Sequence, residues 1–527
     1  MKGPSERITR RELLQASTAG LAGSLICGPG PLLRSSLADS TPPLPSRIYH
    51  ARHGTPVQNV AKVFEMGYGG IEKFIGKDDI VLLRPNLQWR RNGYVNTDVG
   101  KAMIDLILNR PGGFMGEIIV IEDQHRSDPH TNDNSGWITS DKASNGPYNW
   151  FELIQYYVDH QGNYPDGIHE DPITGQINLS FQFLQGHHSF TLENPHPILS
   201  TYGGKSYTGA NELLDHSVDP FHRFKSTFPT ATCFYVRRSD LQYTDSIARV
   251  SPLQNQYYMS YPIFKSQHSG LYVSYFKDHP TAWDPTTESF GAQRVRLINL
   301  CTLNHHSYYA GVTSIVKGHF GMVHGTFHHT GWQAPWPGTE PSTFYYAGGA
   351  VGYWMDKIRR ADLHVSCAER IGLESRLESN AFWAKDLAIS TDPVALDYYV
   401  GKKILFPAGG TYGVGGSKAS SPDSHDPTLP GGYYGLTLEF CRDPLADHSI
   451  INGTLDEDEM AVHLYDFDRL PGDVNGDGVV DLRDQIMIRN RRGQSTAKYP
   501  YADVNRDGRI DIADQVEARR RFGDSAP

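Results

Sequence analysis

Asp79-Ile-Val-Leu-Leu-Arg84 and Glu117-Ile-Ile-Val-Ile121 are the two stretches of sequence that decide the fold. Each is a short apolar run between polar residues, which predicts a buried β-strand. Between them, residues 97–108 carry apolar side chains at helical spacing. A strand–helix–strand unit joins parallel strands, so the sequence predicts an α/β fold with a mostly parallel sheet and flanking helices.

Further elements extend this pattern toward the C-terminus. Residues 294–300 and 387–390 indicate two more buried strands. Thr391-Asp392-Pro393 is a favourable helix start, and it predicts a helix to Ile404 with Asp392 as its N-cap. Residues 126–294 are rich in Tyr, His, Asn, Pro and Gly, and we interpret them as a long insertion with some β structure. Its aromatic side chains form either a sugar-stacking surface or part of a core.

Polar residues follow the predicted strands at their carboxyl ends. In an open parallel sheet these ends line the ligand-binding crevice. Two lysines in the same half of the chain are suited to neutralising an anionic substrate group. The alternatives are a loop carboxylate for the aspartate and solvated surface side chains for the lysines. We expect a catalytic site made of Asn86, Asp123, Lys265, His305, His306 and Lys317.

Six histidines lie within residues 305–329. Imidazole is a common ligand of zinc, copper, nickel and iron, so this density predicts a transition-metal site as one alternative. His324 and His328 have the spacing of one helix face, but Gly325 and the turn-rich sequence around it disfavour a helix. The other alternative is a set of structurally satisfied histidines. The six residues are His305, His306, His319, His324, His328 and His329.

Three blocks of the central sequence resemble a known family. The blocks are residues 81–86 with 117–123, residues 297–321, and residues 387–397, which read Leu-Ala-Ile-Ser-Thr-Asp-Pro-Val-Ala-Leu-Asp. Together they resemble domain-of-unknown-function family 362 over about residues 75–405. The resemblance implies an α/β fold and the candidate positions above, but no particular reaction. Asn304 stands where the family often has Lys, and the chain lacks the ferredoxin-type cysteines of some members.

The C-terminus contains an internal repeat. Residues 473–484 and 503–514 each place Asp or Asn at loop positions 1, 3, 5, 9 and 12, with glycine at position 6. Ca²⁺ prefers six to eight oxygen ligands at this spacing, and the glycine allows the sharp turn. We expect two calcium ions, with position 7 contributing a backbone carbonyl; the alternative is a pair of ion-free turns. The expected ligands are Asp473, Asn475, Asp477, Val479, Asp481 and Asp484, then Asp503, Asn505, Asp507, Arg509, Asp511 and Asp514.

A helix is predicted after each loop, at residues 485–492 and 515–522, and a glycine marks each helix end. Position 12 is Asp, where the usual EF-hand has a bidentate Glu. Over about residues 471–524 this repeat resembles a type I dockerin, a small all-α calcium-binding domain. The resemblance implies a cohesin-like or cell-surface partner. Loop positions 10 and 11, which often carry small hydroxyl residues in dockerins, hold Leu482-Arg483 and Ile512-Ala513.

The N-terminal residues have the pattern of a targeting segment. Arg10-Arg11 precede a short Gly/Ala-rich apolar region, and this arrangement resembles a twin-arginine export signal. Ser36-Leu37-Ala38 ends in the small-residue pattern of a signal peptidase site, so we place cleavage after Ala38. The alternative is an ordinary amphipathic helix. The signal predicts export by the twin-arginine route to the periplasm, the cell surface or the medium.

Composition and charge exclude several classes of protein. The chain has 527 residues, of which 39% are hydrophobic and 20% charged, an ordinary globular mixture. Its net charge of −10 becomes −13 without residues 1–38, which argues against nucleic-acid binding. No apolar run reaches the roughly 18 residues of a membrane span. The four cysteines after residue 38 are far apart, which excludes an iron–sulfur or zinc-knuckle motif.

These patterns predict a signal peptide at 1–38, an α/β domain at 39–465, a linker at 466–470 and a calcium-binding domain at 471–524. The first functional hypothesis is an enzyme of unknown reaction tethered by its tail, and its dockerin-like context implies a role in polysaccharide breakdown by association. The second is a non-catalytic surface-assembly or glycan-binding protein. A glycoside hydrolase is a third hypothesis, and the motifs do not favour it.

Overall fold

The computed structural model describes much of the chain between residues 45 and 525. The long described ranges are 45–123, 136–159, 263–305, 312–319, 346–409, 425–447 and 452–525. Within them, the residues left undescribed are 88, 138, 143–144, 267, 278, 374, 376, 378–380, 476–477, 495, 497–498 and 506. Short strands are also described at 179–184, 201–202, 205–206, 212–213, 234–237, 256–260 and 324–325.

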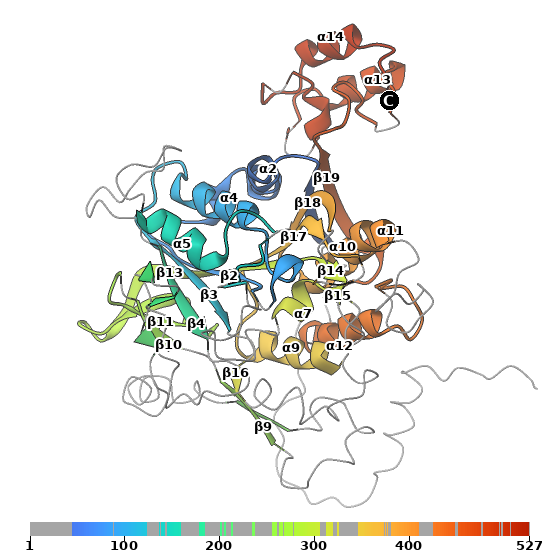
Figure 1. Ribbon diagram of the computed structural model, residues 1–527. Helices are drawn as coiled ribbons and strands as arrows, with labels where there is room; N and C mark the ends of the chain where they lie inside the picture. Colours follow the sequence, from blue (N-terminus) through green and yellow to red (C-terminus); the bar gives the residue numbers. More distant parts are fainter. Residues whose placement is uncertain are drawn as a thin grey trace, which may run out of the picture. The chain divides into compact units, whose positions relative to one another are not determined.

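A mixed sheet of twelve described strands forms the centre of the α/β domain (Figure 1). Eight of these strands form the main run. In spatial order they are β4 (Leu179–Leu184), β3 (Glu117–Asp123), β2 (Ile80–Pro85), β13 (Ser289–Thr302), β17 (Leu363–Ile371), β18 (Phe382–Ser390), β1 (Ser46–Arg52) and β19 (Met460–Asp466). The strands from β4 to β17 are mutually parallel, β18 is antiparallel to β17, β1 is antiparallel to β18, and β19 is parallel to β1.

An antiparallel extension leaves the amino-terminal half of β13. It consists of β12 (Thr281–Asp284), β11 (Tyr272–Ser274), β10 (Ile263–Lys265) and β7 (Glu212–Leu213). Smaller described sheets pair β14 (Asn304–His305) with β15 (Val312–Thr313), β9 (Gln256–Ser260) with β16 (His324–Gly325) and β8 (Phe234–Arg237), and β5 (Thr201–Tyr202) with β6 (Lys205–Ser206). Residues 126–294 therefore contain β structure, as their sequence predicts.

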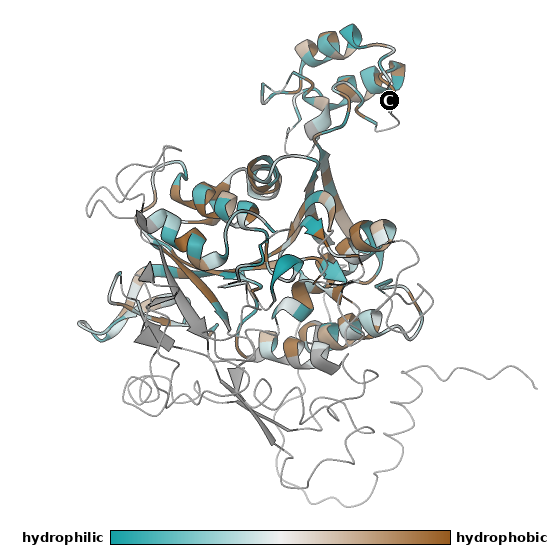
Figure 2. Cartoon of the chain, in the orientation of Figure 1, coloured by the Kyte–Doolittle hydropathy of each residue, from teal (hydrophilic) through white to brown (hydrophobic). Residues whose placement is uncertain are grey.

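Helices cover both faces of the sheet. One apolar cluster lies between the sheet and α2 (Pro56–Tyr68), α3 (Ile71–Phe74), α4 (Thr97–Leu108) and α5 (Trp150–Asp159). A second lies under α7 (Ile315–His319), α9 (Tyr346–Lys357), α10 (Pro393–Val400) and α12 (Tyr433–Asp447). Figure 2 shows brown, hydrophobic residues on the helices next to the sheet and along the sheet strands. A π-helical turn at Gly401–Leu405 and α11 (Phe406–Gly409) continue from α10, and a 3₁₀ turn lies at Arg91–Gly93.

The strand–helix–strand prediction is confirmed at β2, α4 and β3, because the apolar residues at helical spacing in α4 are buried against the sheet. Asn96 caps α4 by accepting hydrogen bonds from the backbone N–H groups of Asp98 and Val99. The strands predicted at 294–300 and 387–390 also form, although both are longer than predicted. The mostly parallel sheet is confirmed: the strands from β4 to β17 are mutually parallel, and β18 then returns antiparallel to β17.

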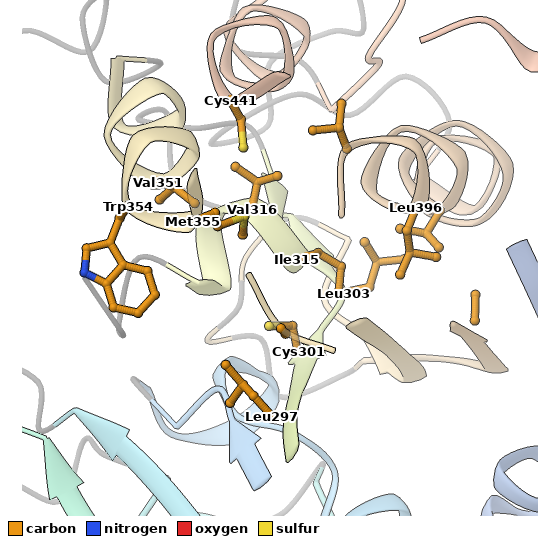
Figure 3. Packing of buried hydrophobic residues seen from close by; sticks show 14 of the residues in the cluster. Leu297, Cys301, Leu303, Ile315, Val316, Val351, Trp354, Met355, Leu396 and Cys441 are labelled. Atoms are coloured by element: carbon orange, nitrogen blue, oxygen red, sulfur yellow. The ribbon is translucent and has the colours of Figure 1, made fainter. Parts of the chain in front are cut away.

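The short helix α7 is held from two sides. The carboxylate of Asp397 accepts a hydrogen bond from the backbone N–H of Val316 (2.8 Å), and the Tyr434 hydroxyl donates to the same carboxylate (3.2 Å). Val316 packs among Val351, Met355 and Cys441 of α9 and α12 (Figure 3). This packing brings the carboxyl end of α7 down onto the sheet.

The tail consists of two short helices, α13 (Leu482–Arg491) and α14 (Ile512–Arg520), and a 3₁₀ turn at Pro500–Ala502. Each helix begins three residues earlier than the sequence predicts. The reason is that the aspartate at loop position 9 acts as the N-cap: Asp481 accepts from the N–H of Arg483 and Asp511 from that of Ala513. The predicted helix ends are confirmed, since Gly493 and Gly523 adopt positive φ.

The two halves of the tail are related by reciprocal contacts. The Gln485 side chain donates to the Gln515 carbonyl oxygen (3.2 Å), and the Gln515 side chain donates to the Gln485 carbonyl oxygen (2.9 Å). Gly493 donates to Ile510, and Gly523 donates to the equivalent Val480. The sequence repeat thus folds into a pair with approximate two-fold symmetry.

Among the helices that the structure describes, none combines the length and apolar character needed to cross a membrane. Three cysteines lie in the described ranges, and each is a buried free thiol: Cys301, Cys367 and Cys441. Burial raises the pKa of the Cys301 and Cys367 thiols to about 12, so these side chains act as apolar packing groups.

Candidate functional site

The connections of the sheet reverse direction between β2 and β13. From β2 the chain moves to β3 and then β4, whereas from β13 it moves to β17 on the other side. β2 and β13 are themselves parallel neighbours. Ligands of open α/β sheets bind outside the carboxyl ends of the strands at such a reversal. The residues after β2 and β13 therefore define the candidate site.

Asn86 lies at this reversal. Its backbone N–H donates to the carbonyl oxygen of Leu300 in β13 (2.9 Å), and its carbonyl oxygen accepts from Val95 (3.0 Å). The side chain is buried, and its Oδ1 has no hydrogen-bond partner in the described part of the chain. The backbone bonds fix the position of the side chain, so Asn86 presents a buried acceptor at the strand ends.

His305 lies beyond the end of β13, in the short strand β14. It is fully buried, and its backbone N–H donates to the carbonyl oxygen of Gly372 (3.0 Å). Its ring meets that of His425 edge-on at 5.4 Å between centroids. Burial, followed by the neighbouring His305, lowers the pKa of His425 to about 4. At neutral pH, His425 is therefore a neutral ring facing His305.

Three further predicted residues are described to different extents. Lys317 is buried on α7, which packs over β13. Asp123 is the last residue of β3, so its backbone lies at the carboxyl edge as predicted, and its side chain is not described. His306 lies outside the described residues.

Lys265 lies elsewhere. It ends β10 in the antiparallel extension, and the adjacent Ser266 donates a hydrogen bond to the carboxylate of Glu117 (2.5 Å). Glu117 begins β3, so this contact places the Ser266 segment beside the amino end of that strand. The sheet thus brings Asn86, Asp123, His305 and Lys317 toward one edge and leaves Lys265 at the other. The sequence did not reveal the antiparallel extension that carries it there.

Asp392 is the predicted N-cap of α10. Its Oδ1 accepts from the backbone N–H groups of Val394 and Ala395 (3.0 Å each), and its Oδ2 accepts from the Ser46 hydroxyl (2.6 Å). Because β18 is antiparallel to β17, this residue follows the end of β18 that lies beside the amino end of β17. Its role here is structural.

The histidine-rich segment does not form a metal centre within the described residues, where no group of three or more His, Cys, Asp or Glu side chains is placed to hold an ion. His305 and His319 are buried in separate surroundings, the first against His425 and the second against His364 and Trp354. The backbone of His324 lies in β16, so the helix that its spacing with His328 would allow does not begin there. His306, His328 and His329 lie outside the described residues.

Sequence reasoning missed a row of buried polar side chains close to the reversal. Arg84, Asn299 and His364 are in direct register on β2, β13 and β17. All three are 0% exposed. The only signal in the sequence was an arginine and an asparagine inside otherwise apolar strands, and register could not be known before the strands were paired. His319 of α7 lies above this row, 6.2 Å from His364 between ring centroids.

The first loop of the tail closes through its last position. The Asp484 carboxylate is fully buried and accepts from the backbone N–H groups of Val474 (2.6 Å) and Asn475 (2.9 Å). The other carboxylate oxygen of Asp484 accepts a hydrogen bond from the backbone N–H of Asp481 (2.8 Å). The Asp473 carboxylate at position 1 accepts from Gly478 (3.0 Å). Asp477 lies outside the described residues.

The second loop repeats this geometry. Asp514 accepts from the N–H groups of Asn505 (3.2 Å) and Asp511 (2.7 Å). Asp503 accepts from Gly508 (3.0 Å) and Asp507 (3.1 Å). In both loops the position-12 carboxylate accepts from the backbone N–H of position 3, which closes the loop. Among the described residues of the tail, as elsewhere in the described chain, no group of three or more Asp, Glu, His or Cys side chains is already placed to hold an ion.

The chemistry of these loops fits calcium. The glycine at position 6 has φ of +83° in the first loop and +86° in the second, as the sharp turn requires. Burial raises the pKa of Asp503, and the neighbouring Asp514 and Asp507 raise it further. A hard divalent cation relieves this repulsion between carboxylates. The side-chain ligands would be Asp473, Asn475, Asp481 and Asp484, then Asp503, Asn505, Asp507, Asp511 and Asp514.

Comparison with known proteins identifies the tail alone. No curated protein and no solved structure matches the chain. The resemblance of residues 75–405 to domain-of-unknown-function family 362 stays a prediction, as does the twin-arginine signal. Residues 471–521 match the family model of the dockerin type I domain, so the calcium-binding tail is a type I dockerin.

Proposed function

We propose that this protein is exported by the twin-arginine route and is held, through its calcium-loaded dockerin, on a cohesin-like partner. The observation that carries the proposal is the dockerin match over residues 471–521, together with two closed, oxygen-lined loops. Type I dockerins bind cohesins, and dockerin-bearing proteins typically act at the cell surface or in the medium.

The tail offers a repeated apolar surface to such a partner. Leu482 and Ile486 lie one turn apart on α13, and they are 63% and 40% exposed. Ile512 and Val516 occupy the equivalent positions on α14, and they are 59% and 47% exposed. Exposed apolar residues that gather on one face mark protein interaction sites. At loop position 10, Leu482 and Ile512 stand where dockerins often carry a small hydroxyl residue, so the partner should recognise apolar side chains.

The cargo of this tail is the α/β domain, for which we propose an enzyme of unknown reaction. Support comes from the positions of Asn86, Asp123 and His305 after or at the carboxyl ends of neighbouring strands, and from the buried Lys317 on α7, which packs over β13. The resemblance to the family of unknown function favours the same positions. A non-catalytic assembly role rests on the tail alone and needs no site in the sheet.

The tethering proposal is tested with the chain from residue 39 to 527 and an immobilised cohesin module. Retention in calcium and release by a chelator are expected. The variant L482S/I486S/I512S/V516S should lose retention and keep two bound calcium ions. The matched control is V57S, which alters an apolar residue of α2 that is 64% exposed and distant in sequence from the tail.

Two results would contradict the proposal. Retention that persists in chelator would remove the role of calcium. Retention that survives the fourfold serine variant, with both ions bound, would remove the role of the apolar face. The enzyme proposal for the cargo fails separately, if H305A changes none of the activities found for the intact chain.

A further inference from the structure

A row of polar side chains crosses the sheet face that is covered by α7. Asn299 pairs in register with Arg84 on one side and with His364 on the other. Arg84 Nη1 donates to Asn299 Oδ1 (3.3 Å), and Asn299 Nδ2 lies 3.2 Å from His364 Nδ1. Each residue is fully buried, so these contacts are not exchanged with solvent.

The hydrogen bonds of the row fix the tautomer of His364. An arginine side chain can only donate, so the oxygen of the Asn299 amide must face Arg84. The NH₂ group of Asn299 then donates to His364 Nδ1, which must be unprotonated. Burial, followed by the charge of Arg360, lowers the pKa of His364 well below its usual value, so the ring is neutral. Its single proton is therefore on Nε2.

The proton on His364 Nε2 has no acceptor in the described part of the chain. The same is true of Arg84 Nε and of the Ser366 hydroxyl, which lies two residues from His364 on the same face of β17. A buried donor without an acceptor is destabilising, because its hydrogen bond to water is lost and not replaced. Several such donors gather around one row, so the row has a place for an acceptor that the described residues do not supply.

His319, the last residue of α7, packs against the row of Arg84, Asn299 and His364. Its ring is fully buried, and neither nitrogen has a partner among the described residues. Gly318 brings the helix this close, because a Cβ at that position would lie 2.4 Å from Cys301 Sγ and 3.5 Å from Arg84 Nη1. Burial lowers the pKa of His319, and His364 and Arg84 lower it further, so this ring is also neutral.

The electrostatics around the two rings favour an anion. Positive charge from Arg84 acts on His319, and positive charge from Arg360 acts on His364. Glu122 balances the charge of Arg84 through Nη2 (2.5 Å), and Arg84 Nε still has no hydrogen-bond partner among the described residues, so it can donate to a ligand. A transition metal is disfavoured, because His364 Nδ1 already accepts from Asn299 and its Nε2 carries the proton. The nearby arginine also repels a cation.

We propose that Arg84, His319, His364 and Ser366 form a binding site for a small oxyanion, a carboxylate or phosphate group, with His364 Nε2–H as a principal donor. Asn299 is a positioning residue: it holds the donor tautomer and does not touch the ligand. The site lies one residue before the carboxyl end of β2, at the reversal of the sheet. It is independent of the dockerin and of the tethering proposal.

The test uses the calcium-loaded chain from residue 39 to 527, desalted to remove free calcium. Binding of inorganic phosphate and of acetate is measured separately by isothermal titration calorimetry, which distinguishes the two sources of the oxyanion. One of the two should bind to the wild-type chain. N299D should weaken that binding at least tenfold, because a carboxylate at 299 accepts from His364 Nδ1 and moves the proton away from Nε2. The matched control N109D, at an exposed position after α4, should bind as the wild type does.

A second measurement does not depend on the variant folding. In the wild-type chain labelled with ¹⁵N-histidine, the spectrum of His364 should show a protonated Nε2 and an unprotonated Nδ1. Protonation at Nδ1 would overturn the proposal. The absence of binding for both phosphate and acetate would also overturn it, because buried water would then supply the acceptors for the donors of the row. Equal binding by the wild type and a folded N299D would overturn the role of Asn299 and of the tautomer.

Discussion

The α/β domain and the tail bury charge in opposite ways. In the sheet, Arg84 and Glu122 are 0% and 2% exposed, and each is balanced by the other. In the tail, the buried carboxylates of Asp473, Asp484 and Asp514 accept mainly from backbone N–H groups of their own loops. The domain therefore carries its own counter-charge, whereas the tail depends on a cation from solution.

The two regions also differ in core size. Extended apolar clusters fill both sides of the sheet. The buried apolar cluster of the tail has six members: Val474, Ile488, Ala502, Val504, Ile510 and Ala518. In Figure 2 the ribbon of the tail helices is largely teal to white, with some brown residues. A core this small is rarely sufficient alone, so we expect metal binding and folding to be coupled in the tail and separate in the α/β domain.

The largest effect on the domain is expected from E122Q. Removing one partner of a buried ion pair leaves the other charge uncompensated, which costs about 3–5 kcal/mol. The free energy of unfolding of the domain, measured by urea with far-UV circular dichroism, should fall by that amount with calcium binding unchanged. The control E65Q changes a half-exposed carboxylate on α2. Equal stability of E122Q and E65Q would show that the sheet does not rely on this pair.

A change in the tail should act only on the tail. D484A removes the carboxylate that closes the first loop, so the calcium content of the chain should drop from two ions to one at micromolar free calcium. Elemental analysis after dialysis measures this. D468A is the control, because Asp468 precedes the loop and is 76% exposed. Two ions retained in D484A would contradict the assignment of this residue as a ligand.

A smaller effect is expected where α7 meets the sheet. In G318A the new methyl group would overlap Cys301 Sγ, and such overpacking costs about 1–3 kcal/mol. The double variant G318A/C301A should recover part of this loss in urea unfolding. No recovery would indicate that the cost lies in the helix itself and not in its contact with β13.

The smallest expected effect is a change in pH dependence. The folded-state pKa of His425 is about 4, below its usual 6.5, so the unfolded chain binds the proton more readily. The contribution of the neutral ring is fully present above pH 6.5 and is lost as the pH falls toward 4. The urea midpoint of H425Q should therefore decrease less than that of the wild type between pH 6.5 and 4. Parallel pH profiles would contradict the lowered pKa.

Local patterns were the predictable part of this molecule. The buried runs at 80–85 and 117–123 and the helix spacing at 97–108 define their elements without knowledge of distant residues. The calcium loops are local as well, since every ligand lies within twelve positions. The early starts of α13 and α14 were missed, because the position-9 aspartate serves as both a candidate ligand and a helix cap.

Features that depend on strand pairing were not predictable from one sequence. β18 returns antiparallel to its sequence neighbour β17, and it also pairs with β1, which lies more than 330 residues away in the chain. Lys265 looked like a site residue until the antiparallel extension placed it away from the carboxyl edge. The row formed by Arg84, Asn299 and His364 exists only through register, so no spacing rule could have assembled it.

One measurement tests the central contrast directly: hydrogen exchange by mass spectrometry on the chain from residue 39 to 527, with calcium and with a chelator. The account predicts that peptides from 473–524 lose protection when calcium is removed, while peptides from β2, β13 and β17 keep theirs. Tail peptides that stay protected in chelator would contradict the dependence of this region on calcium. Loss of protection in the sheet strands would contradict the independence of the domain.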